Sequence, residues 1–224
     1  MEKFAITAAC LLLVLVPFHV VAQDEEEDDV SPIAFQGRVG GVYTGGDPFK
    51  AGATFEGAAL IRFTGPLYFT VMGGSANFES DGDLVPITDE FAQFWEQVLE
   101  TNEILNNDIR FRLNFVSAGA TFVGDFGKLS PQITGGVGAY QVKFVTTFRA
   151  VPKPVPPPDL IDDFAFETSL EDSEWFLGYN FGGGLYYKFN KIVHFGGSVI
   201  YHAIDTDAIE DLVSFSFGMH INIP

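Results

Sequence analysis

Residues 211–223 read DLVSFSFGMHINI, and apolar and polar side chains alternate along nearly the whole stretch. One face of an extended chain would carry Val213, Phe215, Phe217, Met219, Ile221 and Ile223. The other face would carry Ser214, Ser216, His220 and Asn222. A period of two residues is typical of a β-strand whose two faces meet different surroundings. The stretch therefore predicts a strand with one apolar and one polar side.

The same alternation recurs upstream, and it predicts an all-β chain of eight strands. These are 33–44, 51–64, 66–78, 109–123, 129–148, 175–189, 193–203 and 211–223. Only 129–148 breaks the pattern, because Ile133 and Val137 have the opposite parity to Tyr140 and Val142. A β-bulge near the glycines at 135–138 would account for this change.

The connections between these strands alternate between short and long. Tight turns are expected at 64–66, 125–128 and 190–191, and longer loops at 45–50, 79–108, 149–174 and 204–210. An even number of antiparallel strands with short turns at one end and long loops at the other is typical of outer-membrane β-barrels. The predicted fold is thus an eight-stranded antiparallel transmembrane β-barrel, with a soluble exported barrel as the alternative. A bulky Phe/Leu face suits lipid better than a narrow barrel interior.

The N-terminal residues predict export. Residues 1–22 combine Lys3, an apolar run from Ala5 to Val16 and small residues before a cleavage site after Ala22, as in a secretory signal peptide. Residues 23–31 would form an acidic periplasmic tail, and residues 32–224 the barrel domain. Beyond Ala22 no apolar run is long enough for a transmembrane helix.

The net charge of the chain limits the classes of partner that it can bind. The chain has 224 residues with 30 Asp+Glu and 12 Lys+Arg, a net charge of −18, which excludes a general nucleic-acid binder. Most of the acids fall in the long loops, which favours divalent cations or basic surface partners.

The chain resembles the small outer-membrane β-barrel superfamily of Gram-negative bacteria, which includes the OmpA transmembrane domain, OmpX and opacity-type porin-like proteins. The resemblance rests on the export signal, the eight alternating strands and the paired glycines Gly40-Gly41, Gly73-Gly74, Gly182-Gly183-Gly184 and Gly196-Gly197. It implies contact with outer-membrane lipid, lipopolysaccharide and the barrel assembly machinery. The chain departs from the family at its end, because residues 220–224 (HINIP) lack the usual terminal aromatic residue that guides assembly.

Charged and catalytic-type side chains are expected inside the barrel. By parity Arg38, Arg62, Arg110 and Arg112 face inward together with Glu56, and strand pairing brings Arg38 close to Glu56. This predicts a structural ion-pair ladder, or alternatively a narrow anion-preferring pore. His194, Ser198 and His202 share the inner face and suggest a lipid A-modifying enzyme as a second alternative. No catalytic activity and no cofactor are expected.

The long loops carry the remaining candidates. Residues 88–105 have helical spacing with Phe91, Phe94 and Trp95 on one stripe, which either packs on the barrel rim or binds a partner. Asp205, Asp207, Glu210 and Asp211 are weak candidates for a Ca²⁺ site, and no specific metal site is predicted. The expected function is a structural or surface-interaction role at the cell envelope, through envelope integrity, adhesion or ligand contact.

Overall fold

The computed structural model describes residues 31–44, 51–80, 89–206 and 211–223. The predicted signal peptide, nearly all of the acidic tail, and Asp207 and Glu210 lie outside these ranges. Within them, no helix is long and apolar enough to cross a membrane.

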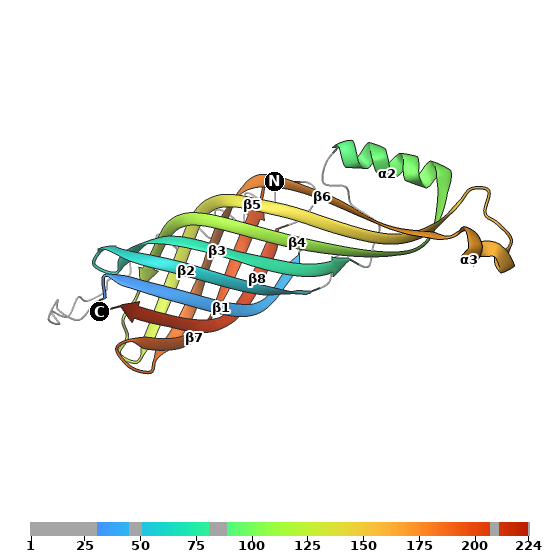
Figure 1. The fold of residues 1–224 in the computed structure, drawn as a ribbon. Helices are drawn as coiled ribbons and strands as arrows, with labels where there is room; N and C mark the ends of the chain where they lie inside the picture. Colours follow the sequence, from blue (N-terminus) through green and yellow to red (C-terminus); the bar gives the residue numbers. More distant parts are fainter. Residues whose placement is uncertain (1–30, 45–50, 81–88, 207–210, 224) are drawn as a thin grey trace, which may run out of the picture. The chain divides into compact units, whose positions relative to one another are not determined.

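Eight strands form a closed antiparallel barrel, as predicted (Figure 1). They are β1 (Ile33–Thr44), β2 (Gly52–Thr64), β3 (Leu67–Ser80), β4 (Asn102–Val123), β5 (Leu129–Pro152), β6 (Phe166–Lys188), β7 (Val193–Ile204) and β8 (Leu212–Ile223). Each strand pairs with the next, and β1 closes the ring against β8 from Ile33↔Ile223 to Thr44↔Leu212. Closure leaves the barrel body without open strand edges.

The three tight turns stand where the sequence predicts them, at one end of the barrel. Gly65 and Gly127 take positive φ angles of 49° and 66°, which L-residues with a side chain rarely adopt. The Asn190 side chain accepts hydrogen bonds from the backbone amides of Ile192 and Val193 and so fixes the third turn.

β4 and β6 are much longer than predicted, and β5 is slightly longer. They span 22, 24 and 23 residues, against 12 to 14 for the other five strands. Pairing of β4 with β5 continues to Asn102↔Pro152, and pairing of β5 with β6 to Ala150↔Phe166. Parts of the expected loops 79–108 and 149–174 are therefore strand. The three strands run past the rest of the barrel, and we call residues 102–114, 141–152 and 166–175 the extension (Figure 1).

Short helices accompany the extension. Helix α2 (Asp89–Thr101) lies between β3 and β4, inside the predicted range 88–105, whose last residues belong to β4 instead. Glu90 in its first turn suits the positive end of the helix dipole. A 3₁₀ turn, η2 (Pro158–Leu160), and a single helical turn, α3 (Ile161–Phe164), connect β5 to β6.

The outer wall of the barrel body is apolar. Phe63, Leu177 and Phe189 are each more than 70% exposed, and large apolar side chains point outward from every strand of the body. Most polar side chains, including Gln36, Glu56, Asn180 and His194, are buried inside. This arrangement is the one expected of a barrel surrounded by lipid and is opposite to that of a soluble barrel.

Two predicted orientations are wrong. Phe111, Leu113 and Phe115 are buried inside the barrel, whereas Arg110 and Arg112 lie on the outer face. The reason is that this part of β4 belongs to the extension or adjoins it, where the outer face is polar and the inner face forms a packed apolar core.

The expected bulge in β5 is also absent. The β4–β5 register runs without a shift from Asn106↔Arg149 to Val123↔Gln132, and the irregularity in this pair lies between Ile104 and Asn106. Tyr140, Val142 and Phe144 are fully buried because they share the inward parity of Gln132.

Candidate functional sites in the lumen and on the extension

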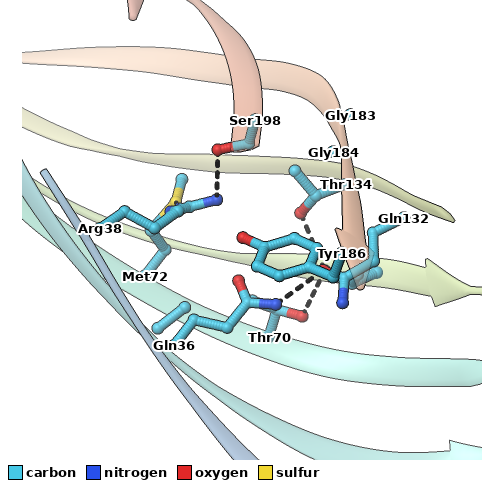
Figure 2. Close-up of a pocket in the computed structure, with 12 residues that line it drawn as sticks. Gln36, Arg38, Thr70, Met72, Gln132, Thr134, Gly183, Gly184, Tyr186 and Ser198 are labelled. Carbon is cyan, nitrogen blue, oxygen red and sulfur yellow. Dashed lines mark hydrogen bonds between the residues drawn. The ribbon is translucent and has the colours of Figure 1, made fainter. Parts of the chain in front are cut away.

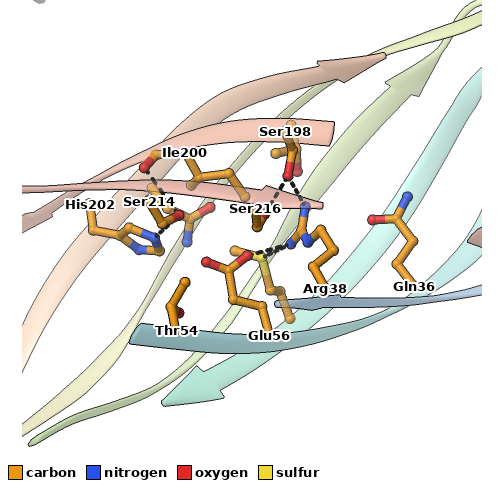
Figure 3. A network of polar contacts seen from close by, with 12 residues as sticks. Gln36, Arg38, Thr54, Glu56, Ser198, Ile200, His202, Ser214 and Ser216 are labelled. Atoms are coloured by element: carbon orange, nitrogen blue, oxygen red, sulfur yellow. Dashed lines mark hydrogen bonds and ion pairs between the residues drawn. The ribbon is translucent and has the colours of Figure 1, made fainter. Parts of the chain in front are cut away.

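A buried ion pair lies in the middle of the barrel. Arg38 Nη2 on β1 is 3.1 Å from Glu56 Oε2 on β2, and the two side chains are 4% and 0% exposed. Arg38 Nη1 also donates to Ser198 Oγ at 3.3 Å, and Ser198 Oγ lies 2.8 Å from Ser216 Oγ (Figure 3). The predicted pairing of Arg38 with Glu56 is therefore present, and the hydroxyls of β7 and β8 extend it across the lumen.

A second polar cluster lies nearer the tight turns. Gln36 Nε2 donates to Gln132 Oε1 at 2.6 Å and lies 3.0 Å from His220 Nδ1. The His220 ring is stacked on the His194 ring with centroids 5.1 Å apart. Hydrogen-bonded side chains from opposite walls thus tie the barrel together across its interior.

The space left in the lumen is very small. A cavity of about 10 Å³ is bounded by residues of both polar clusters, and the Tyr186 ring lies among the side chains that line it (Figure 2). A volume of this size holds about one water molecule. The side chains that line this cavity therefore leave little space at this level of the lumen.

Aromatic side chains fill the other half of the lumen. Phe115 is stacked on Tyr140 with centroids 5.6 Å apart and lies 5.0 Å from the His202 ring. Phe111 packs against Phe78 on β3 and Phe144 on β5, at 5.8 Å and 5.9 Å. The alternation that predicts Arg110 and Arg112 inside the barrel predicts Phe111 and Phe115 on its outer wall, so the sequence did not predict this core.

The helix α2 covers the inner face of the extension. The Phe91 ring meets Phe144 edge-on at 4.6 Å, and the Trp95 ring meets Phe148 edge-on at 5.1 Å. Phe91 and Trp95 are buried, whereas Phe94 is 45% exposed. The predicted aromatic stripe therefore divides into two residues that pack on the extension and one that faces outward.

The other predicted lumen residues lie elsewhere. Arg62 is half-buried beside the first tight turn, where its Nε donates to Gly65 O at 3.0 Å. On the outer face of the extension, Arg110 forms an ion pair with Asp108 at 2.7 Å, and Arg112 Nε donates to Asn77 Oδ1 at 2.9 Å. The structure thus brings Arg38 and Glu56 together and separates the remaining three arginines from them.

The serine and histidines suggested for catalysis are all buried in the lumen. The hydrogen bonds of Ser198 go to Arg38 and Ser216, whereas His202 lies 3.3 Å from Tyr140 Oη. A nucleophilic serine needs a base within hydrogen-bond reach, and neither of these contacts supplies one to Ser198.

The acidic candidates do not form a cluster among the residues with described positions. Asp211 accepts a hydrogen bond from Tyr201 Oη, and Asp205 donates its backbone amide to Leu177 O. The described part of the chain contains no group of three or more His, Cys, Asp or Glu placed to hold a metal ion.

No family model matches the chain, and no curated protein matches it. Solved structures do show the same kind of fold. The attachment invasion locus protein Ail of Yersinia pestis, solved in complex with the heparin analogue sucrose octasulfate, is 14% identical with a TM-score of 0.45, over 86% of this chain and 97% of Ail. Neisserial surface protein A is 13% identical with a TM-score of 0.47, over 86% and 98% of the two chains. The outer-membrane protein OprG of Pseudomonas aeruginosa is 9% identical with a TM-score of 0.42, over 87% and 98%. The structural neighbours are thus small outer-membrane β-barrels, and the likeness concerns the fold alone.

Proposed function

We propose that this chain is an integral outer-membrane protein that presents the extension at the cell surface for contact with a partner. The observation that carries the proposal is that the outer surface of β4, β5 and β6 changes from apolar to polar along the strands. The wall is apolar around the barrel body and becomes polar along the extension, with Arg110, Arg112 and Lys143 on its outer face. Such a change is expected where strands leave lipid and enter water.

The orientation follows from the lengths of the connections. Small outer-membrane barrels have short periplasmic turns and longer extracellular loops. The tight turns after β2, β4 and β6 would then lie in the periplasm, and the extension with α2 outside the cell. The predicted signal peptide would provide the export that this location requires.

A contact role fits the structure better than conduction. The lumen holds a buried ion pair, polar side chains that hydrogen-bond to one another across it, and an aromatic core. Its polar half has room for about one water. We therefore do not favour the anion-preferring pore. In planar bilayers the purified protein should give no stepwise conductance, and regular openings with anion preference would restore the pore hypothesis.

A contact role also fits better than catalysis on lipid A. Ser198 is buried inside the barrel and hydrogen-bonded to Arg38 and Ser216, so lipid outside the wall cannot reach it. Expression of the protein should leave the mass spectrum of lipid A unchanged.

The central test is location and exposure. The protein should fractionate with outer membranes, show heat-modifiable migration on gels and require detergent for extraction. Protease added to intact cells should cut only in the connections at the end opposite the tight turns, which include the segments around the extension. Extraction into buffer without detergent, or cleavage at the tight turns instead, would contradict the proposal. Cells with and without the protein can then be compared for adhesion, detergent sensitivity and serum survival.

A further inference from the structure

Strand β6 leaves the barrel wall with one edge open. Its pairing with β7 begins at Gly178↔Ile204, and one backbone hydrogen bond from Asp205 N to Leu177 O continues it. From Phe166 to Phe176, β6 pairs with β5 on one side, and no described strand pairs with the other side. An open edge presents a row of backbone donors and acceptors that an added strand can complete.

The strand that forms this open edge, β6, carries several carboxylate side chains. By alternation Glu167 and Glu171 point to the outer face of the extension, and Asp172 and Glu174 to the inner face. The stretch 166–177 contains no Lys or Arg. Charge on the edge is therefore of one sign, and it would attract a strand that carries cations.

The outer face already alternates in charge from β5 to β6. Lys143 Nζ on β5 forms an ion pair with Glu171 Oε1 at 2.5 Å, and Arg149 lies opposite Glu167 in the β5–β6 register. A further strand with cations beside the two glutamates would repeat this order. Opposite charges on adjacent strands stabilise a sheet, and like charges destabilise it.

A second copy of the chain is a poor occupant of this edge. The other edge of the extension that no described strand pairs belongs to β4, whose pairing with β3 ends at Ser80↔Ile109. Residues 102–108 on that edge include Glu103 and Asp108 and no cation. Pairing β6 with itself or with β4 of another copy would bring carboxylates together, which disfavours edge-to-edge dimers.

We propose that the β6 edge from Phe166 to Phe176 binds an extended basic segment of a partner protein, which adds to the extension as a further strand. Basic residues four positions apart on the segment would face Glu167 and Glu171, because both lie on one face of β6. The small side chain of Ser169 between them leaves room for the intervening residue of the segment. This inference rests on the proposed function, since the edge must be outside the cell to meet a partner.

The test uses the full-length mature protein, folded in detergent micelles and verified by heat-modifiable migration. The probe is a short synthetic peptide of threonine and valine with lysine at every fourth position and a fluorescent label. We expect it to bind and to slow amide hydrogen exchange in 166–176. The double variant Glu167→Gln and Glu171→Gln should weaken binding about three- to tenfold, as expected for the loss of two cross-strand charge pairs.

Three controls make the result specific. The double variant Glu96→Gln and Glu100→Gln removes the same charge from the exposed face of α2 and should leave binding unchanged. A peptide with glutamate in place of lysine should not bind. A lysine peptide with N-methylated alternate amides should also fail, because it cannot form the backbone ladder.

Several outcomes would contradict the inference. Equal binding of the N-methylated peptide, equal weakening by the α2 variant, or protection on β4 or α2 in place of β6 would overturn the inference. Cross-linking of two copies through β6 would show that a second copy is the occupant. If the barrel folds and inserts but does not bind the lysine peptide, this inference alone is overturned. If the chain does not enter the outer membrane, the proposed function is overturned.

Discussion

The guanidinium of Arg38 lies 3.1 Å from the carboxylate of Glu56 at the centre of the barrel, and both side chains are shielded from solvent. Removing one partner leaves the other charge buried without compensation. We expect Glu56→Gln to lower the free energy of unfolding by about 3–5 kcal/mol. Urea unfolding in lipid vesicles, followed by tryptophan fluorescence, measures this loss.

The double variant Arg38→Met with Glu56→Met is the matched control for the ion pair. It removes both charges together, so it should recover most of the stability that the single variant loses. A loss below about 1 kcal/mol in the single variant would be the size of a solvated surface pair. Such a result would mean that water reaches the pair and that the lumen is wetter than its side-chain packing indicates.

The helix α2 provides a second test, because Phe91 and Trp95 are buried on the extension while Phe94 on the same helix is 45% exposed. Trp95→Ala removes the edge-on contact with Phe148. The free energy for opening α2 should fall by about 3 kcal/mol, or to the point where the helix exchanges freely. Amide hydrogen exchange of residues 89–101 reports this opening.

Phe94→Ala is the control on α2 and should change the opening free energy by less than about 0.5 kcal/mol. Equal effects of the two substitutions would show that α2 does not pack through the Trp95 side. The pair of variants therefore separates helix docking from a general loss of apolar surface.

Two glycines on β1 give a third prediction. A Cβ on Gly40 would lie 1.9 Å from the carbonyl oxygen of Phe215 on β8, whereas a Cβ on Gly37 would have no atom within 4 Å. Gly40→Ala should lower the free energy of unfolding by about 1–3 kcal/mol or more, since β1 and β8 must move apart. The folded fraction on a gel and urea unfolding both measure the effect.

Gly37→Ala should be neutral or slightly stabilising, because it restricts the unfolded chain without a clash in the folded one. If Gly40→Ala is tolerated equally well, the close approach of β1 and β8 is not a requirement of the barrel. The comparison is matched, since both residues lie on one strand and gain the same methyl group.

The sequence was sufficient to predict the barrel because most strands keep one environment on each face throughout. In β8, Phe215 and Phe217 point outward along its whole length, and Ser214 and Ser216 point inward. The order in which the strands pair around the barrel, the tight turns and the Arg38–Glu56 pair follow from that alternation and from the short connections. These features depend on local pattern and on pairing of neighbouring strands.

The extension was not predictable in the same way. Along β4 the outer face changes from Val116 to Arg112, and the inner face from Ser117 to Phe111, without any change of parity. Alternation shows that the two faces differ but does not show which one meets lipid. Where strands leave the membrane the apolar face becomes the inner one, as in a soluble domain. The same change of surroundings in β5 produced the pattern that suggested a bulge.

Cysteine labelling on intact cells tests this change of surroundings directly. Cys10 is the single cysteine and lies in the predicted signal peptide, so the wild-type chain serves as the blank. With a membrane-impermeant maleimide, Arg112→Cys should be labelled, because position 112 is exposed on the outer face of the extension, which the proposed function puts in water. Phe111→Cys should be protected by the packed core, and Leu177→Cys by lipid, although Leu177 is 75% exposed in the isolated chain. Labelling at 111 but not at 112 would reverse the assignment of the two faces of β4. Labelling at 177 would show that the lipid boundary lies closer to the tight turns than the apolar outer wall of the barrel body indicates.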